Sequence, residues 1–218
     1  VPFCQAGVRF EGELLGCPLH NLIPEWNDLL WNGNYEGALQ RLRKTSPFPE
    51  ITGRVCPALC EKACVCGRIS EPVTVRENEL AIAEYGFEND LIQPCVPQVR
   101  SDRKIAVIGS GPAGLAAAYY LNRRGHTVTV FEKDAVPGGL LTYGIPEMKL
   151  PKCVVARRIA LLTQEGISFR SSCCVGTDIS AQELAEQYDL VIFCCGAQQP
   201  RPLPCAEQAP QGVYYALD

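Results

Sequence analysis

The sequence predicts a two-part fold in which a cysteine-rich, α-helical half precedes an α/β half built on a parallel sheet. In residues 1–92, apolar residues recur at helical spacing among closely spaced cysteines, with no alternating strand pattern. From Lys104 onward the pattern changes to strand, helix and strand. A chain of 218 residues is long enough for two domains of modest size.

The charge balance and the apolar runs argue against two classes of partner. Lys and Arg number 20 against 24 Asp and Glu, and the resulting net charge of −4 disfavours nucleic acid as a partner. Every apolar run is broken well short of the ~20 residues that a membrane helix needs. We therefore expect a soluble protein that binds neither nucleic acid nor a membrane.

Cysteine usage indicates the compartment. The chain has 13 cysteines, an odd number, and no secretory signal at its start. Their close spacing in one region favours thiolates that act as ligands in a reducing compartment, by default the cytoplasm, over disulfides. The only methionine is Met148, so Val1 is not an initiator residue, and we expect the chain to be a processed or truncated piece.

Two helices are expected early in the cysteine-rich half. Asn21 is expected to cap the first, with Pro24 in its first turn. The apolar residues of this helix share one face: Ile23, Trp26, Leu29 and Leu30. The second helix runs from about Tyr35 to Leu42.

The rest of this half leads through the cysteines to a linker. The prolines and the glycine of Thr45–Gly53 indicate a loop that delivers the chain to Cys56. A helix over Val75–Tyr85 closes the half, and Gln93–Arg103 is expected to be the linker.

The second half begins with a βαβ unit. Its expected elements are a strand over Ile105–Ile108, a helix over Pro112–Arg124 and a strand over Thr127–Phe131. The α/β pattern continues with a helix over Lys152–Glu165, a strand over Ile167–Phe169, a helix over Ala181–Tyr188 and a strand over Leu190–Phe193.

A glycine-rich turn in this unit predicts a dinucleotide site. Residues 109–114 match G-x-G-x-x-G between a strand and a helix, and Glu132 follows the next strand 18 residues after Gly114. Gly109 permits a tight turn, Gly111 lets the backbone approach a pyrophosphate, and Gly114 lets the helix pack closely. The phosphates would meet the helix N-terminus. The motif alone does not separate FAD from NAD(P).

The segment after the second strand favours FAD. The paired glycines Gly138 and Gly139 would let the backbone approach a bulky ring system. By spacing alone, the same pair is equally consistent with an ordinary loop.

The cysteines of the first half predict a metal centre. Cys56, Cys60 and Cys64 recur every four residues, and on one helix this stripe would point Cys56 and Cys64 about 80° apart, toward two centres. Cys4 and Cys17 supply further thiols. Soft thiolates suit iron–sulfur clusters or zinc, and the absence of a C-x-x-C pair makes a zinc ribbon less expected. Clusters are favoured, with zinc or buried structural thiols as open alternatives.

Four segments of the sequence carry a family resemblance. They are Val1-Pro2-Phe3-Cys4-Gln5, the twelve residues Gly16–Asn27, the fourteen residues Phe48–Glu61 and the eight residues Tyr143–Leu150. With the glycine-rich turn, they resemble the small (beta) subunits of NADPH-dependent glutamate synthases, nearly end to end. The same architecture occurs in the N-terminal part of dihydropyrimidine dehydrogenase.

The resemblance implies an α-helical iron–sulfur (alpha-helical ferredoxin-like) domain at residues 1–92, a linker at 93–103 and a Rossmann-like FAD-binding domain at 104–218. The first domain holds two [4Fe-4S] clusters in the family. The resemblance assigns Cys17, Cys56 and Cys60 to one cluster, with Glu79 at the position of an oxygen ligand, and Cys4 and Cys64 to the other. The remaining two cysteines of that second cluster precede the position of Val1 in the family.

The resemblance also assigns the FAD contacts. They are the phosphate turn Gly109, Ser110, Gly111, Pro112, Ala113 and Gly114, the ribose acid Glu132 with Lys133, Gly139 and Leu140 near the ring, and Lys149, Val175, Gly196 and Ala197. No residue is given a catalytic role, because the cofactors carry the redox chemistry.

The family inserts an NADPH domain into the FAD domain. Only 21 residues follow Ala197, so we expect an N-terminal fragment that has an incomplete FAD domain, lacks the NADPH domain and does not oxidise NADPH alone.

The resemblance implies a function for the whole enzyme. Electrons would pass from NADPH through FAD and the clusters to a large subunit that makes glutamate from 2-oxoglutarate and glutamine. The alternatives are a subunit of another NAD(P)H oxidoreductase, for ferredoxin:NADP or pyrimidine reduction, and a non-redox assembly scaffold.

Overall fold

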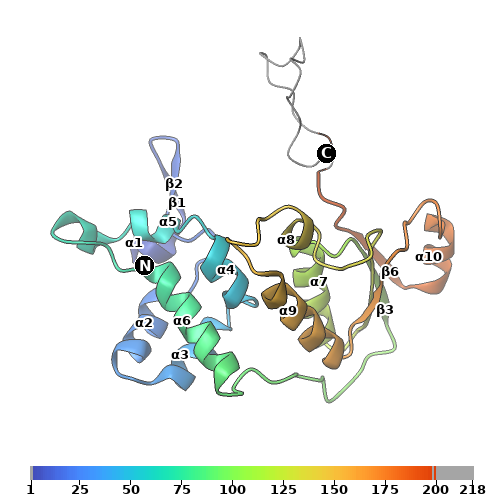
Figure 1. Ribbon diagram of the computed structural model, residues 1–218, viewed down its shortest axis with the longest axis horizontal. Coiled ribbons are helices and arrows are strands. Elements are labelled where there is room, and N and C mark those ends of the chain that lie inside the picture. The colour runs from blue at the N-terminus through green and yellow to red at the C-terminus, as the bar shows by residue number, and fades with distance from the viewer. Residues whose placement is uncertain (1, 198, 200–218) are drawn as a thin grey trace, which may run out of the picture. The chain divides into compact units, whose positions relative to one another are not determined.

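The computed structural model of the chain describes residues 2–197 and 199, and it divides into two compact units (Figure 1). The first unit comprises Val1–Gln93 with Met148–Val154, and the second comprises Pro94–Glu147 with Val155–Asp218. Within the described part of the chain, no helix is both long and apolar enough to cross a membrane.

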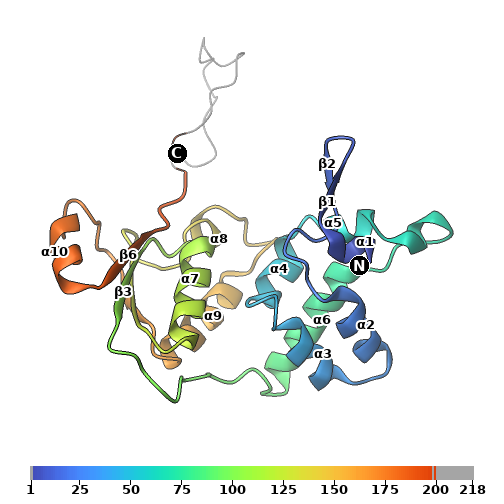
Figure 2. The ribbon, with the colours of Figure 1, turned by 180° about the vertical axis from the view of Figure 1, so that it is seen from behind.

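The first unit is mainly helical. Its α-helices are α1 (Phe3–Ala6), α2 (Ile23–Trp31), α3 (Tyr35–Leu42), α4 (Pro49–Val55), α5 (Leu59–Lys62) and α6 (Val75–Glu88), with a short 3-10 helix η1 at Val65–Arg68. Helix α6 packs against α2, α3 and α4, as Figures 1 and 2 show. Trp26, Leu42 and Ile82 are fully buried between these helices. The predicted helices over residues 35–42 and 75–85 are confirmed, the latter being three residues longer.

The predicted cap of α2 is wrong. Leu22, not Asn21, precedes the first helical residue, and no side chain caps this end. Asn21 is instead buried, and its Oδ1 makes no hydrogen bond. Pro24 lies in the first turn as expected, because a proline there removes an N–H that has no partner within the helix.

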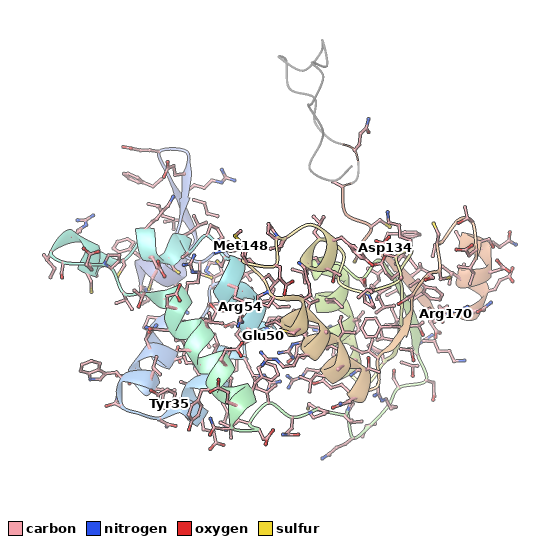
Figure 3. All side chains as sticks on the ribbon, viewed as in Figure 1. Tyr35, Glu50, Arg54, Asp134, Met148 and Arg170 are labelled. Carbon is pink, nitrogen blue, oxygen red and sulfur yellow. The ribbon has the colours of Figure 1, made fainter. Side chains whose placement is uncertain are left out.

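The predicted loop over residues 45–53 is wrong from Pro49 onward. Pro49 begins helix α4, since its fixed φ suits the first position of a helix. Gly53 lies inside α4 against α6, where a Cβ atom would come within 2.9 Å of the Leu80 Cβ. The glycine therefore marks a close helix crossing rather than a loop. Arg54, labelled in Figure 3, joins the same two helices through an ion pair with Glu84 at 2.8 Å.

The first unit also contains a short hairpin, so the expectation of no strands in this half is wrong. Strands β1 (Val8–Phe10) and β2 (Glu13–Leu15) pair antiparallel. Both strands have three residues, and every residue of β1 is exposed, so no alternation of buried and exposed positions exists to reveal them.

The second unit is a parallel sheet covered by helices on both faces. The strands are β3 (Lys104–Ile108), β4 (Thr127–Phe131), β5 (Ser168–Arg170) and β6 (Leu190–Phe193), in the order β5-β4-β3-β6. The helices are α7 (Pro112–Arg123), α8 (Leu140–Tyr143), α9 (Lys152–Gln164) and α10 (Ala181–Gln187). Figures 1 and 2 show α7 and α10 on opposite sides of the sheet. The predicted βαβ unit and the later α/β elements are confirmed within one residue at their ends.

The two faces of the sheet have separate apolar cores. Ala106, Ile108 and Phe131 pack with Leu184 of α10 on one face. Because successive strand residues point to opposite faces, Ile105 and Val107 lie on the other, where α7 contacts β3 and β4. The whole of β3 after Lys104 is therefore buried, as a central strand of a parallel sheet requires.

The close crossing of α4 and α6 yields a first prediction. Gly53→Ala is expected to lower the free energy of unfolding of the first unit by about 1–3 kcal/mol, because the new methyl group meets the Leu80 backbone. Gly67→Ala is the control, since its Cβ would meet no atom closer than 3.7 Å, and we expect a change within about 0.5 kcal/mol. Denaturant unfolding followed by circular dichroism measures both. Equal midpoints for the two variants would contradict the close crossing.

Candidate functional site

A close approach at Gly16 and two backbone hydrogen bonds gather the cysteine-bearing segments of the first unit. Gly16 has a left-handed φ of +80°, and a Cβ there would lie 2.3 Å from the Phe3 carbonyl oxygen. The Gly16 N–H donates to the Leu59 carbonyl at 3.1 Å, and the Cys17 N–H donates to the Cys4 carbonyl at 2.7 Å. The N-terminal segment, the Cys17 turn and α5 are thus held side by side.

The cysteines at 56, 60 and 64 do not lie on one helix, so the predicted stripe is wrong. Cys56 follows α4, Cys60 lies within α5, and Cys64 precedes η1. Cys56 has the extended conformation usual before a proline, since Pro57 cannot continue the helix. Ala58 then adopts a left-handed conformation that turns the chain into α5.

Mutual electrostatic effects show which thiols are neighbours. Burial raises the pKa of Cys60 to about 12, with Cys56 and Cys17 adding to the rise. Burial likewise raises the pKa of Cys56, and Glu79 and Cys17 raise it further. Cys17, Cys56 and Cys60 therefore lie within range of one another's charge, and Glu79 lies within range of Cys56.

Cys4 and Cys64 form a second neighbourhood. Burial raises the pKa of Cys4, and the largest charge effect on it comes from Cys64, with a smaller one from Cys17. Cys66, to which the sequence gives no role, forms a hydrogen bond with the Cys64 thiol. Burial alone would raise the pKa of Cys64, but this bond and backbone hydrogen bonds at Val73, Cys66 and Gly67 hold it below its usual value.

The thiols are spaced more widely than ligands of a single ion. Among residues 2–197 and 199, no three His, Cys, Asp or Glu side chains converge closely enough to hold one metal ion. A four-iron cluster offers a separate iron to each ligand, so its thiolates need not meet at one point. All cysteines in the described part of the chain are free, including the five predicted ligands.

Glu79 is a buried carboxylate with one oxygen unpartnered. Its side chain lies on α6 and the residue is 6% exposed. Oε1 accepts hydrogen bonds from the Thr52 hydroxyl at 2.5 Å and from the Ser46 hydroxyl at 3.1 Å. No hydrogen bond from the described residues reaches Oε2. Burial raises the pKa of Glu79 and the charge of Glu50 adds to the rise, and together they outweigh the two hydroxyls, which lower it.

The phosphate turn of the second unit has two glycines that the fold requires. Gly109 has φ +99°, and a Cβ there would lie 2.5 Å from the Cys194 carbonyl oxygen. A Cβ on Gly114, in the first turn of α7, would lie 1.9 Å from the Gly109 carbonyl oxygen. Both positions therefore exclude any side chain on packing grounds alone.

Gly111 differs from Gly109 and Gly114, because the fold leaves the space of its hypothetical Cβ empty. It has φ −64° and ψ −178°, which any residue adopts, and no atom lies within 4 Å of its hypothetical Cβ. It precedes α7, whose N-terminus has no side-chain cap and begins with Pro112 and Ala113. The open side of Gly111 faces a helix end that favours anions, so a pyrophosphate fits the space that a Cβ would fill.

Glu132 is bound to the phosphate turn itself. Its Oε2 accepts from the Ser110 N–H at 2.9 Å and from the Ser110 hydroxyl at 2.5 Å, and its Oε1 accepts from the Asp134 N–H at 3.0 Å. Burial on its own would raise the pKa of Glu132, but these hydrogen bonds outweigh it and hold the pKa below its usual value. The spacing of the sequence motif predicts only a ribose contact for Glu132. No pattern in the sequence predicts its hydrogen bonds with Ser110.

Ser110 also ties the turn to the paired glycines. The Gly138 N–H donates to the Ser110 hydroxyl at 2.8 Å, and a Cβ on Gly139 would lie 2.9 Å from the Gly111 Cα. The structure therefore brings Gly139 to the phosphate turn, and Leu140 follows it as the first residue of α8.

The remaining predicted contacts lie in three places. Gly196 and Ala197 follow β6, which pairs with β3, so they lie at the same edge of the sheet as Gly109. Val175 packs against the core on the α10 face, and Lys133 is exposed directly after Glu132. Lys149 is exposed and belongs to the segment Met148–Val154 of the first unit.

Comparison with known families defines the class of protein. Residues 13–91 match the family of dihydropyrimidine dehydrogenase domain II, which holds a 4Fe-4S cluster, and residues 107–158 match the NAD(P)-binding Rossmann-like domain. The chain joins an iron–sulfur domain to a Rossmann-like domain, and the predicted fold class is confirmed.

Comparison with whole proteins is more specific. The glutamate synthase [NADPH] small chain of Bacillus subtilis (strain 168) is 55% identical over 218 residues, which are 100% of this chain and 44% of that protein. The same small chain of Mycobacterium tuberculosis (strain H37Rv) is 46% identical over 100% of this chain and 43% of its own length. Glutamate synthase [NADH] of Saccharomyces cerevisiae is 45% identical over 99% of this chain and 10% of its own length.

The chain is therefore related along its whole length to the small chains of NADPH-dependent glutamate synthases. It spans a little under half the length of these bacterial relatives.

The different environments of Gly111 and Gly114 yield a second prediction. Gly111→Ala is expected to fold with an unchanged melting temperature and to weaken FAD binding, because its methyl group occupies the space of the pyrophosphate. A cost of about 1–3 kcal/mol corresponds to roughly 5- to 150-fold in Kd.

Gly114→Ala is expected to lose the fold of the second unit, because its methyl group overlaps the Gly109 carbonyl. Thermal unfolding and flavin fluorescence titration measure the two effects. Unchanged FAD affinity of Gly111→Ala would place the dinucleotide elsewhere.

Proposed function

We propose that this chain is the iron–sulfur and FAD-binding part of an NADPH-dependent glutamate synthase small chain. The observation that carries the proposal is the group formed by Cys17, Cys56, Cys60 and the unpartnered oxygen of Glu79, in a chain 55% identical over its whole length to such a small chain. Three thiols and one carboxylate oxygen supply the four ligands of a [4Fe-4S] cluster. Cys4 and Cys64 are proposed as ligands of a second cluster.

The second unit is proposed to hold FAD. Gly111 and the N-terminus of α7 bind its pyrophosphate, and Glu132, the proposed ribose contact, fixes the turn through Ser110. The close approach of Gly139 to Gly111 extends the open backbone surface beyond the phosphates, which supports FAD over a nucleotide held by the turn alone. Lys133, Leu140, Lys149, Val175, Gly196 and Ala197 are proposed as further contacts.

The cofactors supply the redox chemistry: FAD exchanges electrons in pairs or singly, and an iron–sulfur cluster exchanges them one at a time. The residues of the chain bind, orient and shield these groups. The burial of the Cys60 and Glu79 side chains lowers the local dielectric and so affects the potential of a bound cluster.

The complete reaction is proposed for the whole assembly, of which this chain is one part. NADPH would reduce FAD, and electrons would leave through the clusters to a large subunit that makes glutamate from 2-oxoglutarate and glutamine. In the yeast relative the matching region makes up 10% of one long polypeptide named glutamate synthase, which supports a lasting association with a much larger partner. The free cysteines support a reducing compartment, the cytoplasm.

The proposed ligands yield a third prediction. Cys60→Ser is expected to lower the iron and acid-labile sulfide of the anaerobically purified protein by about four atoms each per chain, because a hydroxyl is a poor substitute for a buried thiolate. Cys95→Ser is the control, since Cys95 is exposed and belongs to the second unit. Equal iron in both variants, or zinc in place of iron, would contradict the proposed cluster.

A further inference from the structure

We propose that Ser46 and Thr52 are positioning residues that fix the Glu79 carboxylate so that its free oxygen, Oε2, faces iron. The inference rests on the proposed function, because it takes Glu79 as a ligand of the cluster held by Cys17, Cys56 and Cys60. Neither residue belongs to the proposed ligand set, although Thr52 lies in the segment Phe48–Glu61.

The three side chains form a polar network in the first unit, and the Thr52 hydroxyl also lies 3.2 Å from the Phe48 carbonyl oxygen. The two hydroxyl oxygens lie 3.3 Å apart, and each lies within hydrogen-bond distance of Glu79 Oε1, at 2.5 Å from Thr52 and 3.1 Å from Ser46. Ser46 is 2% exposed and Glu79 is 6% exposed. Thr52 is half-buried, so the network lies at the edge of the interior of the unit.

Both donors bind the same oxygen, and this asymmetry indicates a ligand. A polar atom that is shut off from solvent without a partner costs about 1–3 kcal/mol, and Glu79 Oε2 is not one of these atoms. Here Oε2 receives no hydrogen bond from the described residues, and none of the ion pairs among them involves Glu79. Oε2 is therefore open to a ligand, and a metal ion there would be a partner of opposite charge for the carboxylate.

Helix α4 places the network beside a proposed thiolate ligand. Thr52 and Cys56 are four residues apart, and the Cys56 N–H donates to the Thr52 carbonyl at 2.9 Å. Residues at this spacing share one side of a helix, so the Thr52 hydroxyl and the Cys56 thiol point the same way. Glu79 is close enough to Cys56 to raise its pKa. The hydroxyl that holds Glu79 and the thiol that would share its cluster therefore come from one turn of α4.

Two donors on one oxygen restrict rotation of the carboxylate about its last bond. With Oε1 fixed, the direction of Oε2 is also fixed, which is how outer hydrogen bonds orient a metal ligand. A single hydroxyl would leave the carboxylate free to rotate about that bond. We therefore expect the two hydroxyls to act together, with the double variant affected more than either single one.

The test compares Thr52→Val, Ser46→Ala and their combination with the unaltered protein, at its full natural length and purified anaerobically. Glu79→Gln shows the effect of the carboxylate itself, and Thr52→Ser restores a hydroxyl at the same place. Thr163→Val is the matched control, because its hydroxyl donates to the Ile159 carbonyl on an exposed part of α9. The measurements are iron loss to a chelator, the midpoint potential and the electron paramagnetic resonance spectrum.

We expect the double variant to lose iron about tenfold faster, the change typical of a lost outer hydrogen bond. Its potential and spectrum should change in the same direction as those of Glu79→Gln, with Thr52→Ser and Thr163→Val unchanged. If the unaltered protein binds no cluster, the proposed function fails and the inference with it. If Glu79→Gln changes the spectrum but the double variant does not, the positioning role alone is overturned. An unchanged Glu79→Gln spectrum overturns it as well, since Glu79 is then no ligand.

Discussion

The first unit depends on the close crossing of α4 and α6 at Gly53. Without a Cβ, Gly53 lets α4 approach the Leu80 backbone, and the residues on either side of this contact are those of the proposed cluster site. Thr52 precedes Gly53, Glu79 precedes Leu80, and Cys56 ends the same helix. A methyl group at position 53 would push the two helices apart. The Thr52 hydroxyl, the Glu79 carboxylate and the Cys56 thiol would then move away from one another. Packing geometry thus sets the geometry of the polar groups.

The second unit uses glycine in two separate ways. Gly109 and Gly114 are required by the packing of the chain on itself, whereas Gly111 stands in open space next to the N-terminus of α7. Ser110 and Glu132 then stiffen the turn from inside, so that the free backbone of Gly111 is held in place without a ligand. A preformed turn of this kind loses little conformational entropy when a phosphate binds.

The sequence predicts the α/β half well because its central strands β3 and β4 are largely buried apolar runs and its turn is a spaced motif, two signals that are local along the chain. It fails at α4, because Pro49 and Gly53 are also typical of loops, and their meaning depends on Leu80, 27 residues after Gly53. The cysteine stripe fails because Pro57 ends the helix. Ser46 and Thr52 carry no signal at all, since their partner Glu79 is 33 and 27 residues away and is chosen by tertiary packing.

The central claim is that one chain holds both a flavin and an iron–sulfur cluster that exchange electrons. An anaerobic reductive titration of the FAD-loaded, reconstituted protein with dithionite tests it directly, because FAD takes up about two electrons and each cluster about one. The account predicts an uptake of at least about three electrons per chain, with loss of flavin absorbance and appearance of a cluster signal in the electron paramagnetic resonance spectrum. Uptake by the flavin alone, or no uptake, would contradict it.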